Sequence, residues 1–154
     1  MTESCRILVD ADACPVKEEI YKVAFRHKVK VTLVANSYLR IPQHPDINLI
    51  VVSDGFDAAD DWIADQSGTK DIIITADILL ADRCLKAGAT VIAPTGKPFT
   101  PDTIGGAIAT RAIMADLRGS GDQVGGGPKP FSKKDRSAFL QALDAAAVKV
   151  SRSP

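Results

Sequence analysis

Two aspartates on alternate residues end the first apolar segment of the chain. In the stretch "RILVDADACPVKEEI" (6–20), five residues typical of a buried strand run into Asp10 and Asp12, and an amphipathic helical segment follows. Residues two apart in extended backbone project toward the same side. Both carboxylates can therefore face the same space at the end of a strand.

A second pair of carboxylates follows another apolar segment. Asp77 ends "DIIITAD", and Asp82 lies five residues further on, in the first turns of the next expected helix. Carboxylates crowded together repel and raise one another's pKa values, and a divalent cation removes that penalty. Such a cation also supplies an activated water and a clamp on phosphate oxygens. Asp10, Asp12 and Asp77 are therefore the candidate catalytic and metal-binding residues, with Asp82 as a further candidate ligand.

The other potential ligands narrow the choice of metal. The chain has two histidines and three cysteines, and no two cysteines form a CxxC pair. A disulfide framework, a structural zinc site and a zinc enzyme are therefore not expected. Oxygen ligands favour Mg²⁺ or Mn²⁺.

Local structure offers a competing explanation for several of these carboxylates. Asp57 and Asp60 have the spacing of a helix N-cap and its third helical position. Asp77 is equally well explained as the cap of a helix that starts at Ile78. Asp10 ends an apolar strand and caps nothing obvious.

The elements that must position these residues alternate along the chain. Apolar strands are expected at 6–10, 30–36, 47–53, 71–77 and 89–94, with helices between most of them. This order predicts an α/β fold, a three-layer αβα sandwich with a central parallel sheet, in which ligands bind beyond the carboxyl ends of the strands. If the first and fourth strands are neighbours, Asp10 and Asp77 converge.

The chain is expected to form one domain with a C-terminal helical arm. Residues 1–118 make up the α/β domain, residues 119–131 a loop rich in glycine and proline, and residues 132–154 a helix that packs on the same domain. Ser132 and Asp135 have capping-box spacing at the start of that helix.

Charge is unevenly distributed although the net charge is zero. Residues 1–100 hold 11 Lys and Arg against 14 Asp and Glu, whereas residues 101–154 hold 8 against 5. A basic arm beside an acidic metal site would suit a polyanion, and ordinary surface variation explains the charges equally well. The candidate phosphate-binding residues are Arg111, Arg118, Lys129, Lys133 and Lys134.

Composition and the N-terminal residues bound the class of protein. A chain of 154 residues suits one domain with a sizeable core. No apolar run reaches the roughly 20 residues of a membrane helix, and "MTESCRILVD" lacks the features of a secretory signal. A cytoplasmic protein without membrane contact is expected.

Two phosphate-handling families share parts of this pattern. "LVDADAC" resembles the first motif of haloacid-dehalogenase-type phosphatases, which would make Asp10 a nucleophile and Asp12 an acid. Cys14 replaces the usual threonine or valine of that motif, and Pro15 opens a helix where those enzymes have a squiggle and flap.

The pattern also resembles response-regulator receivers. Asp10 and Asp12 would be their acidic pair, Asp54 the phosphoacceptor, Thr75 the hydroxyl of the fourth strand and Lys97 the lysine of the fifth. The acidic pair is split by one residue here, and the part of the chain beyond residue 101 has no place in a receiver.

A third resemblance covers nearly the whole chain. Four blocks in order, "VDADACPVK", "GFDAADDWI", "TADILLADRCLKAGA" and "GGPKPFSKKDRSAF", look like those of the YaiI/YqxD family of uncharacterised bacterial proteins. That family is similar to PIN-like nucleases, whose acidic strand-end residues bind divalent metal and hydrolyse nucleic acid, mostly RNA. The resemblance implies a PIN-like fold, places Asp10 and Asp77 at the first and fourth strand ends, and adds Asp57, Asp60 and Asp82 as metal ligands.

The expected function is therefore a divalent-metal-dependent nuclease, a hydrolase acting on RNA or single-stranded nucleic acid. Aspartate phosphotransfer of the receiver type or phosphatase activity of the dehalogenase type is the alternative. A catalytically silent domain that binds nucleic acid or a protein is the third possibility, because fold does not fix chemistry.

Overall fold

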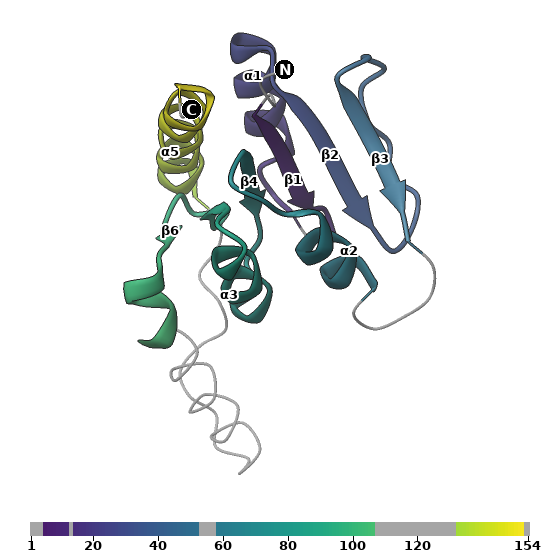
Figure 1. The fold of residues 1–154 in the computed structure, drawn as a ribbon. Coiled ribbons are helices and arrows are strands. Elements are labelled where there is room, and N and C mark those ends of the chain that lie inside the picture. Colours follow the sequence, from purple (N-terminus) through teal and green to yellow (C-terminus); the bar gives the residue numbers. More distant parts are fainter. Residues whose placement is uncertain (1–4, 13, 53–57, 107–131, 153–154) are drawn as a thin grey trace, which may run out of the picture.

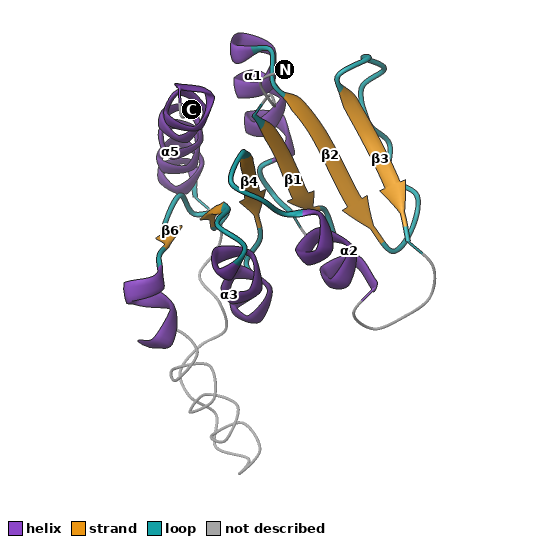
Figure 2. Cartoon of the chain, viewed as in Figure 1, coloured by secondary structure: helices purple, strands orange, loops and turns teal. Residues whose placement is uncertain are grey.

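The computed structural model describes residues 5–12, 14–52, 58–106 and 132–152. Within these ranges the chain forms one mostly parallel β-sheet flanked by helices on both faces (Figures 1 and 2). The α/β class and the three-layer arrangement predicted from the alternating pattern are confirmed.

The sheet has six strands in the spatial order β3-β2-β1-β4-β5-β6. The first five strands run parallel, and β6 pairs antiparallel with β5. Their bounds are Arg6–Asp10 (β1), Lys30–Ala35 (β2), Ile47–Val51 (β3), Asp71–Ile74 (β4), Thr90–Ile92 (β5) and Pro98–Phe99 (β6). The first and fourth strands are therefore neighbours, which is the condition for Asp10 and Asp77 to converge.

Each face of the sheet carries its own apolar core. Ile7 and Val9 of β1 face a cluster completed by α1 (Lys17–His27) and α5 (Lys133–Arg152). Leu8, between them, faces the opposite cluster, completed by α2 (Ala58–Gln66) and α3 (Ile78–Lys86). Successive strand side chains point to opposite faces, so a strand covered on both sides is apolar throughout.

The C-terminal helix is part of the core. Phe139 and Leu143 are fully buried in the same cluster as α1. Gly96, after β5, has φ +90° and lies so close to α5 that a Cβ there would be 2.6 Å from the carbonyl carbon of Ala138. Only glycine fits such a backbone approach, and this contact fixes α5 against the end of β5.

Polar contacts along α5 support its position. Ser132 and Asp135 form the predicted capping box, each side chain accepting a hydrogen bond from the other residue's backbone N–H at 3.1 Å. Asp144 pairs with His27 at 2.7 Å and with Arg26 at 3.2 Å, both on α1. The helix expected at residues 132–154 is thus found at Lys133–Arg152.

Some predicted boundaries of helices and domains differ from the structure, and others lie outside the described residues. The helix expected to open at Pro15 begins at Lys17, with Val16 as N-cap and no side-chain cap. A helix begins at Pro101 and continues through the described residues 101–106. The loop at 119–131 and the domain boundary at 118 lie outside the described residues.

No helix in the described ranges is long and apolar enough to cross a bilayer.

Candidate acidic site

The candidate site lies where the strand connections change direction. From β1 the chain moves outward to β2 and β3, and β4 then returns to the other side of β1. The crevice at the carboxyl ends of two such strands is the usual ligand site of open α/β sheets. Asp10 ends β1, and Asp77 lies three residues beyond the end of β4.

Asp10 is held at this point by a neighbouring threonine. The register pairs Val9 with Ile74, which brings Asp10 beside Thr75. The Thr75 hydroxyl donates to Asp10 Oδ2 at 2.9 Å and accepts the backbone N–H of Asp77 at 3.0 Å. Thr75 is 1% exposed, so its hydroxyl is a fixed link between the two aspartates.

The surroundings of Asp10 disfavour its charge. Burial raises the pKa of the Asp10 carboxyl, the Thr75 hydrogen bond opposes that rise, and the charges of Asp12 and Asp77 raise the pKa further. Among the described residues, no lysine or arginine contributes a lowering effect to this pKa. The three carboxylates therefore lie close enough to interact, with no described cation to balance them.

Asp12 and Asp77 are each fixed by backbone donors. Asp12 Oδ2 accepts the N–H of Asn36, just past the end of β2, at 3.0 Å. Asp77 is the N-cap of α3, and its Oδ1 accepts the N–H groups of Leu79 at 2.9 Å and Leu80 at 3.2 Å. The capping explanation for Asp77 is confirmed, and its Oδ2 accepts no hydrogen bond from the described residues.

The remaining candidate ligands do not gather around Asp10. Asp82 forms an ion pair with Lys86 on α3 at 2.9 Å, and its charge is not among the causes that shift the pKa of Asp10. Asp60 is half-buried on α2, and Asp57 lies outside the described residues. Within the described ranges, no three His, Cys, Asp or Glu side chains are grouped so that they could hold a metal ion. The carboxylates whose charges act on the pKa of Asp10 are Asp12 and Asp77, and these three form the interacting set.

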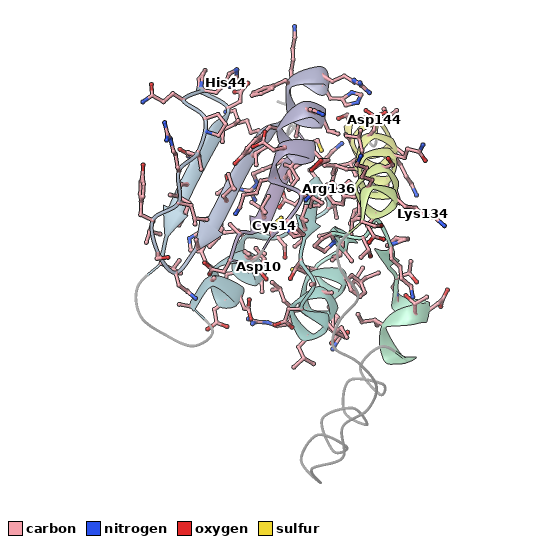
Figure 3. All side chains as sticks on the ribbon, turned by 180° about the vertical axis from the view of Figure 1, so that it is seen from behind. Asp10, Cys14, His44, Lys134, Arg136 and Asp144 are labelled. Carbon is pink, nitrogen blue, oxygen red and sulfur yellow. The ribbon has the colours of Figure 1, made fainter. Side chains whose placement is uncertain are left out.

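The basic residues expected to bind phosphate are only partly described. Lys133 and Lys134 are exposed in the first turn of α5, and Figure 3 shows Lys134 pointing away from Asp10. Arg136 is tied to α1, because it donates to the Pro15 carbonyl at 2.7 Å and lies 3.3 Å from Glu19 Oε1. The other three candidates lie outside the described residues, namely Arg111, Arg118 and Lys129.

All three cysteines are free and buried. Burial raises the pKa of the Cys14 thiol, which disfavours the reactive thiolate. Cys14 therefore has the surroundings of a structural cysteine rather than those of a nucleophile.

Two features of the site were not predicted in this role. Thr75 enters the sequence-based predictions only as a receiver-type hydroxyl, whereas here it joins Asp10 to Asp77. The Asn36 backbone, 24 residues from Asp12, holds the second carboxylate. The threonine of "TAD" could have indicated the Thr75 link, because its hydroxyl is evident in the sequence. The Asn36 hydrogen bond could not have been predicted, because every residue type other than proline has a backbone N–H.

Comparison with known sequences identifies the family of this α/β protein. Residues 8–149 match the model described as "Uncharacterized BCR, YaiI/YqxD family", and the chain belongs to that family.

Relatives of similar length share most of the sequence. A UPF0178 protein of Sphingopyxis alaskensis is 71% identical over 147 residues, covering 95% of each chain. A UPF0178 protein of Nitrobacter winogradskyi is 59% identical over 148 residues, covering 96% of this chain and 94% of the relative. Among solved structures there is no significant match.

Proposed function

We propose that this protein is a divalent-metal-dependent phosphodiesterase that cleaves RNA or another single-stranded nucleic acid. The observation that carries the proposal is the placement of Asp10. It lies at the switch point of a parallel sheet, is held by Thr75, and interacts with Asp12 and Asp77 without a described cation. A group of carboxylates of this kind suits a hard cation bound to a phosphate.

The donor set fits Mg²⁺ or Mn²⁺ with few protein ligands. The candidate ligands, Asp10, Asp12 and Asp77, offer carboxylate oxygens, which these cations prefer. Mg²⁺ usually keeps several waters and is held by one or two carboxylates together with phosphate oxygens. Asp10 would be the main ligand, with the free oxygen of Asp77 or the carboxylate of Asp12 as the second.

Each residue of the site has a part in this proposal. When bound, the cation would lower the pKa of a water and polarise the phosphodiester. Asp10 would hold the cation, and Thr75 would fix the orientation of its carboxylate. Asp77, itself fixed as the cap of α3, and Asp12, fixed by the Asn36 backbone, would orient the water. Exposed Lys133 and Lys134 would attract the polyanion, and the reaction would take place in the cytoplasm.

The strand order favours this reaction over receiver-type phosphotransfer. Receivers of the CheY type have the order 2-1-3-4-5, which puts the third strand next to the first. In this chain β3 is the edge strand and β2 separates it from β1. The strand order of this chain is therefore not that of a CheY-type receiver, and Asp54, the receiver-type phosphoacceptor, lies outside the described residues.

The test is cleavage of a labelled single-stranded oligoribonucleotide with Mg²⁺ or Mn²⁺. Wild-type protein should cleave it, and EDTA should stop cleavage. Asp10→Asn should reduce the rate at least about 100-fold, because even the loss of a residue that only orients a metal ligand costs about 10- to 100-fold. Asp61→Asn is the matched control, because Asp61 is an exposed carboxylate paired with Arg83 at 2.9 Å. Hydrolysis of a phosphomonoester but not of the oligonucleotide, or stable phosphorylation of Asp54, would replace this proposal by one of its alternatives.

A further inference from the structure

A hollow lies between the start of α1 and the segment that connects β2 to β3. Its volume is about 540 Å³. One wall consists of Lys17, Glu18 and Tyr21 of α1, and the other of Tyr38 and residues 40–43. None of these residues belongs to the carboxylate site described above.

The aromatic side chain of this hollow faces water. Tyr38 is 79% exposed, although a tyrosine of a folded protein usually buries most of its ring. Its ring makes no aromatic contact, and its hydroxyl no hydrogen bond, with the residues that the structure describes. An exposed ring beside a groove provides a face on which a nucleic-acid base can stack.

Two cations accompany this ring. Lys17 and Arg40 line the same hollow, and neither forms an ion pair with another described residue. By contrast, Arg6, Arg83 and Arg136 are each paired with a carboxylate. The charges of Lys17 and Arg40 are thus available to a phosphate group.

A second hollow continues along the same two walls. It has a volume of about 440 Å³ and is lined by Ala24, Phe25 and Lys28 of the α1 side and by His44 and Asp46 of the connection. Phe25 is 47% exposed, and its ring centre lies 4.9 Å from that of His44. Aromatic and basic side chains therefore line both hollows, which together are called the groove below, and this is the pattern of surfaces that follow a single strand.

The groove begins beside the carboxylate site. Asn36, whose N–H binds Asp12, is two residues before Tyr38. The charges of both Lys17 and Asp10 act on the pKa of the Cys14 thiol, so both residues lie near Cys14. A strand bound in the groove could thus reach Asp10 within a short distance.

We infer that the groove between α1 and the β2–β3 connection binds single-stranded nucleic acid, with a base stacked on Tyr38 and phosphates held by Lys17 and Arg40. The inference rests on the proposed function and names the surface that recognises its substrate. The groove, rather than the start of α5, supplies the main contacts, because Lys134 points away from Asp10 (Figure 3). A single strand is favoured over a duplex because only an unpaired base exposes its face to a ring.

The experiment measures binding in EDTA, where cleavage does not interfere. A fluorescein-labelled 12-nucleotide oligouridylate is titrated with protein, and anisotropy is followed at several salt concentrations. Tyr38→Ala should weaken binding at least about fivefold, the low end of base–aromatic stacking, whereas Tyr38→Phe should stay within about twofold of wild type. Lys17→Ala with Arg40→Ala should reduce the log–log salt slope by about 0.7 for each phosphate that the variant no longer binds.

The matched control is Lys22→Ala, an exposed lysine of α1 that does not line either hollow. It should leave both affinity and slope unchanged, and thermal unfolding should show that all variants remain folded. No binding by wild type at low salt, equal binding by Tyr38→Ala, or equally strong competition by a duplex of the same length would overturn the inference.

The readout separates this inference from the proposed function. If Tyr38→Ala loses binding but no variant or wild type cleaves RNA with metal, the groove stands and the nuclease proposal fails. If wild type cleaves RNA and the groove variants bind and cleave as well as it does, the nuclease proposal stands and the groove fails.

Discussion

The strand pair β1–β4 has one carboxylate at its amino end, Asp71, and another at its carboxyl end, Asp10, and the surroundings of the two carboxylates are opposite. At the amino ends, Arg6 and Asp71 are register partners, and the guanidinium donates to both carboxylate oxygens of Asp71 at 3.0 and 2.9 Å. The N–H of Gly68 adds a third bond at 2.9 Å. This carboxylate is buried and fully compensated.

At the carboxyl ends, Asp10 has a hydroxyl as partner and two further carboxylates nearby. Burial and the charges of Asp12 and Asp77 make its ionised form costly, and only Thr75 offsets part of that cost. Structural ion pairs remove such a cost, whereas sites for ligands and metals retain it until the ligand arrives. The carboxylate at the amino end therefore joins β1 to β4, whereas the carboxylate at the carboxyl end is left without a compensating cation among the described residues.

The largest change in stability should come from removing the ion pair between Arg6 and Asp71 at the amino ends of the two strands. Asp71→Ala removes the acceptor of two Arg6 hydrogen bonds and of the Gly68 N–H, although Arg6 still donates to the Gln66 carbonyl at 3.0 Å. The variant should lower the free energy of unfolding by about 3 kcal/mol, the low end for a buried pair, because the Arg6 side chain is 33% exposed. Urea unfolding at neutral pH measures the change. Asp61→Ala, which breaks the exposed pair with Arg83, should change stability by no more than about 0.5 kcal/mol, and an equal loss in both variants would contradict the comparison.

The next largest change in stability should come from adding a divalent cation, which would bind the carboxylates at the carboxyl ends of the two strands. Mg²⁺ or Mn²⁺ at tenfold its dissociation constant should stabilise the wild-type protein by about 1.4 kcal/mol, because it binds only the folded state. Asp10→Asn and Asp77→Asn should abolish the rise in melting temperature, and the asparagine introduced by the second substitution would still cap α3. A rise that survives Asp10→Asn would place the cation elsewhere.

A smaller effect should follow from neutralising Asp10 without metal. Because the folded pKa of Asp10 is raised, its contribution to stability is full below its unfolded pKa of about 4 and is lost as pH rises through the folded pKa. Asp10→Asn should therefore be about 1 kcal/mol more stable than wild type at pH 7 in EDTA, and the advantage should vanish near pH 3. Urea unfolding at both pH values tests this, and a variant less stable at pH 7 would mean that Asp10 is compensated after all.

The smallest effect should come from an exposed pair that stabilises the docking of α5. The hydrogen bond from His27, together with the charges of His27 and Arg26, lowers the pKa of the Asp144 carboxyl. A lowered folded pKa gives stability that is present above the unfolded pKa of about 4 and is lost as pH falls through the folded pKa. Asp144→Asn should cost no more than about 0.5 kcal/mol at pH 6, and the cost should decrease as pH falls below about 4, measured by urea unfolding. A cost that does not change with pH would point to packing rather than charge.

The sequence predicted where the strands end better than it predicted which side chains pair across them. Apolar periodicity and alternation predicted parallel strands, and from them the approach of Asp10 and Asp77. The partners are remote along the chain, since Arg6 and Asp71 are 65 residues apart and so are Asp10 and Thr75. Such pairs depend on strand register, which local patterns do not specify. The short β6 and the groove beside Tyr38 escaped prediction for the same reason.

The position of α5 also has a consequence for how the chain is made. Arg136 reaches Pro15 across 121 residues, and His27 reaches Asp144 across 117. Until α5 has been synthesised, the sheet face around Ile7 and Val9 lacks one of its two covering helices and presents apolar side chains to water. A nascent chain that has completed β5 therefore resembles an aggregation-prone intermediate, and its protection during translation depends on chaperones or on rapid synthesis of the last helix.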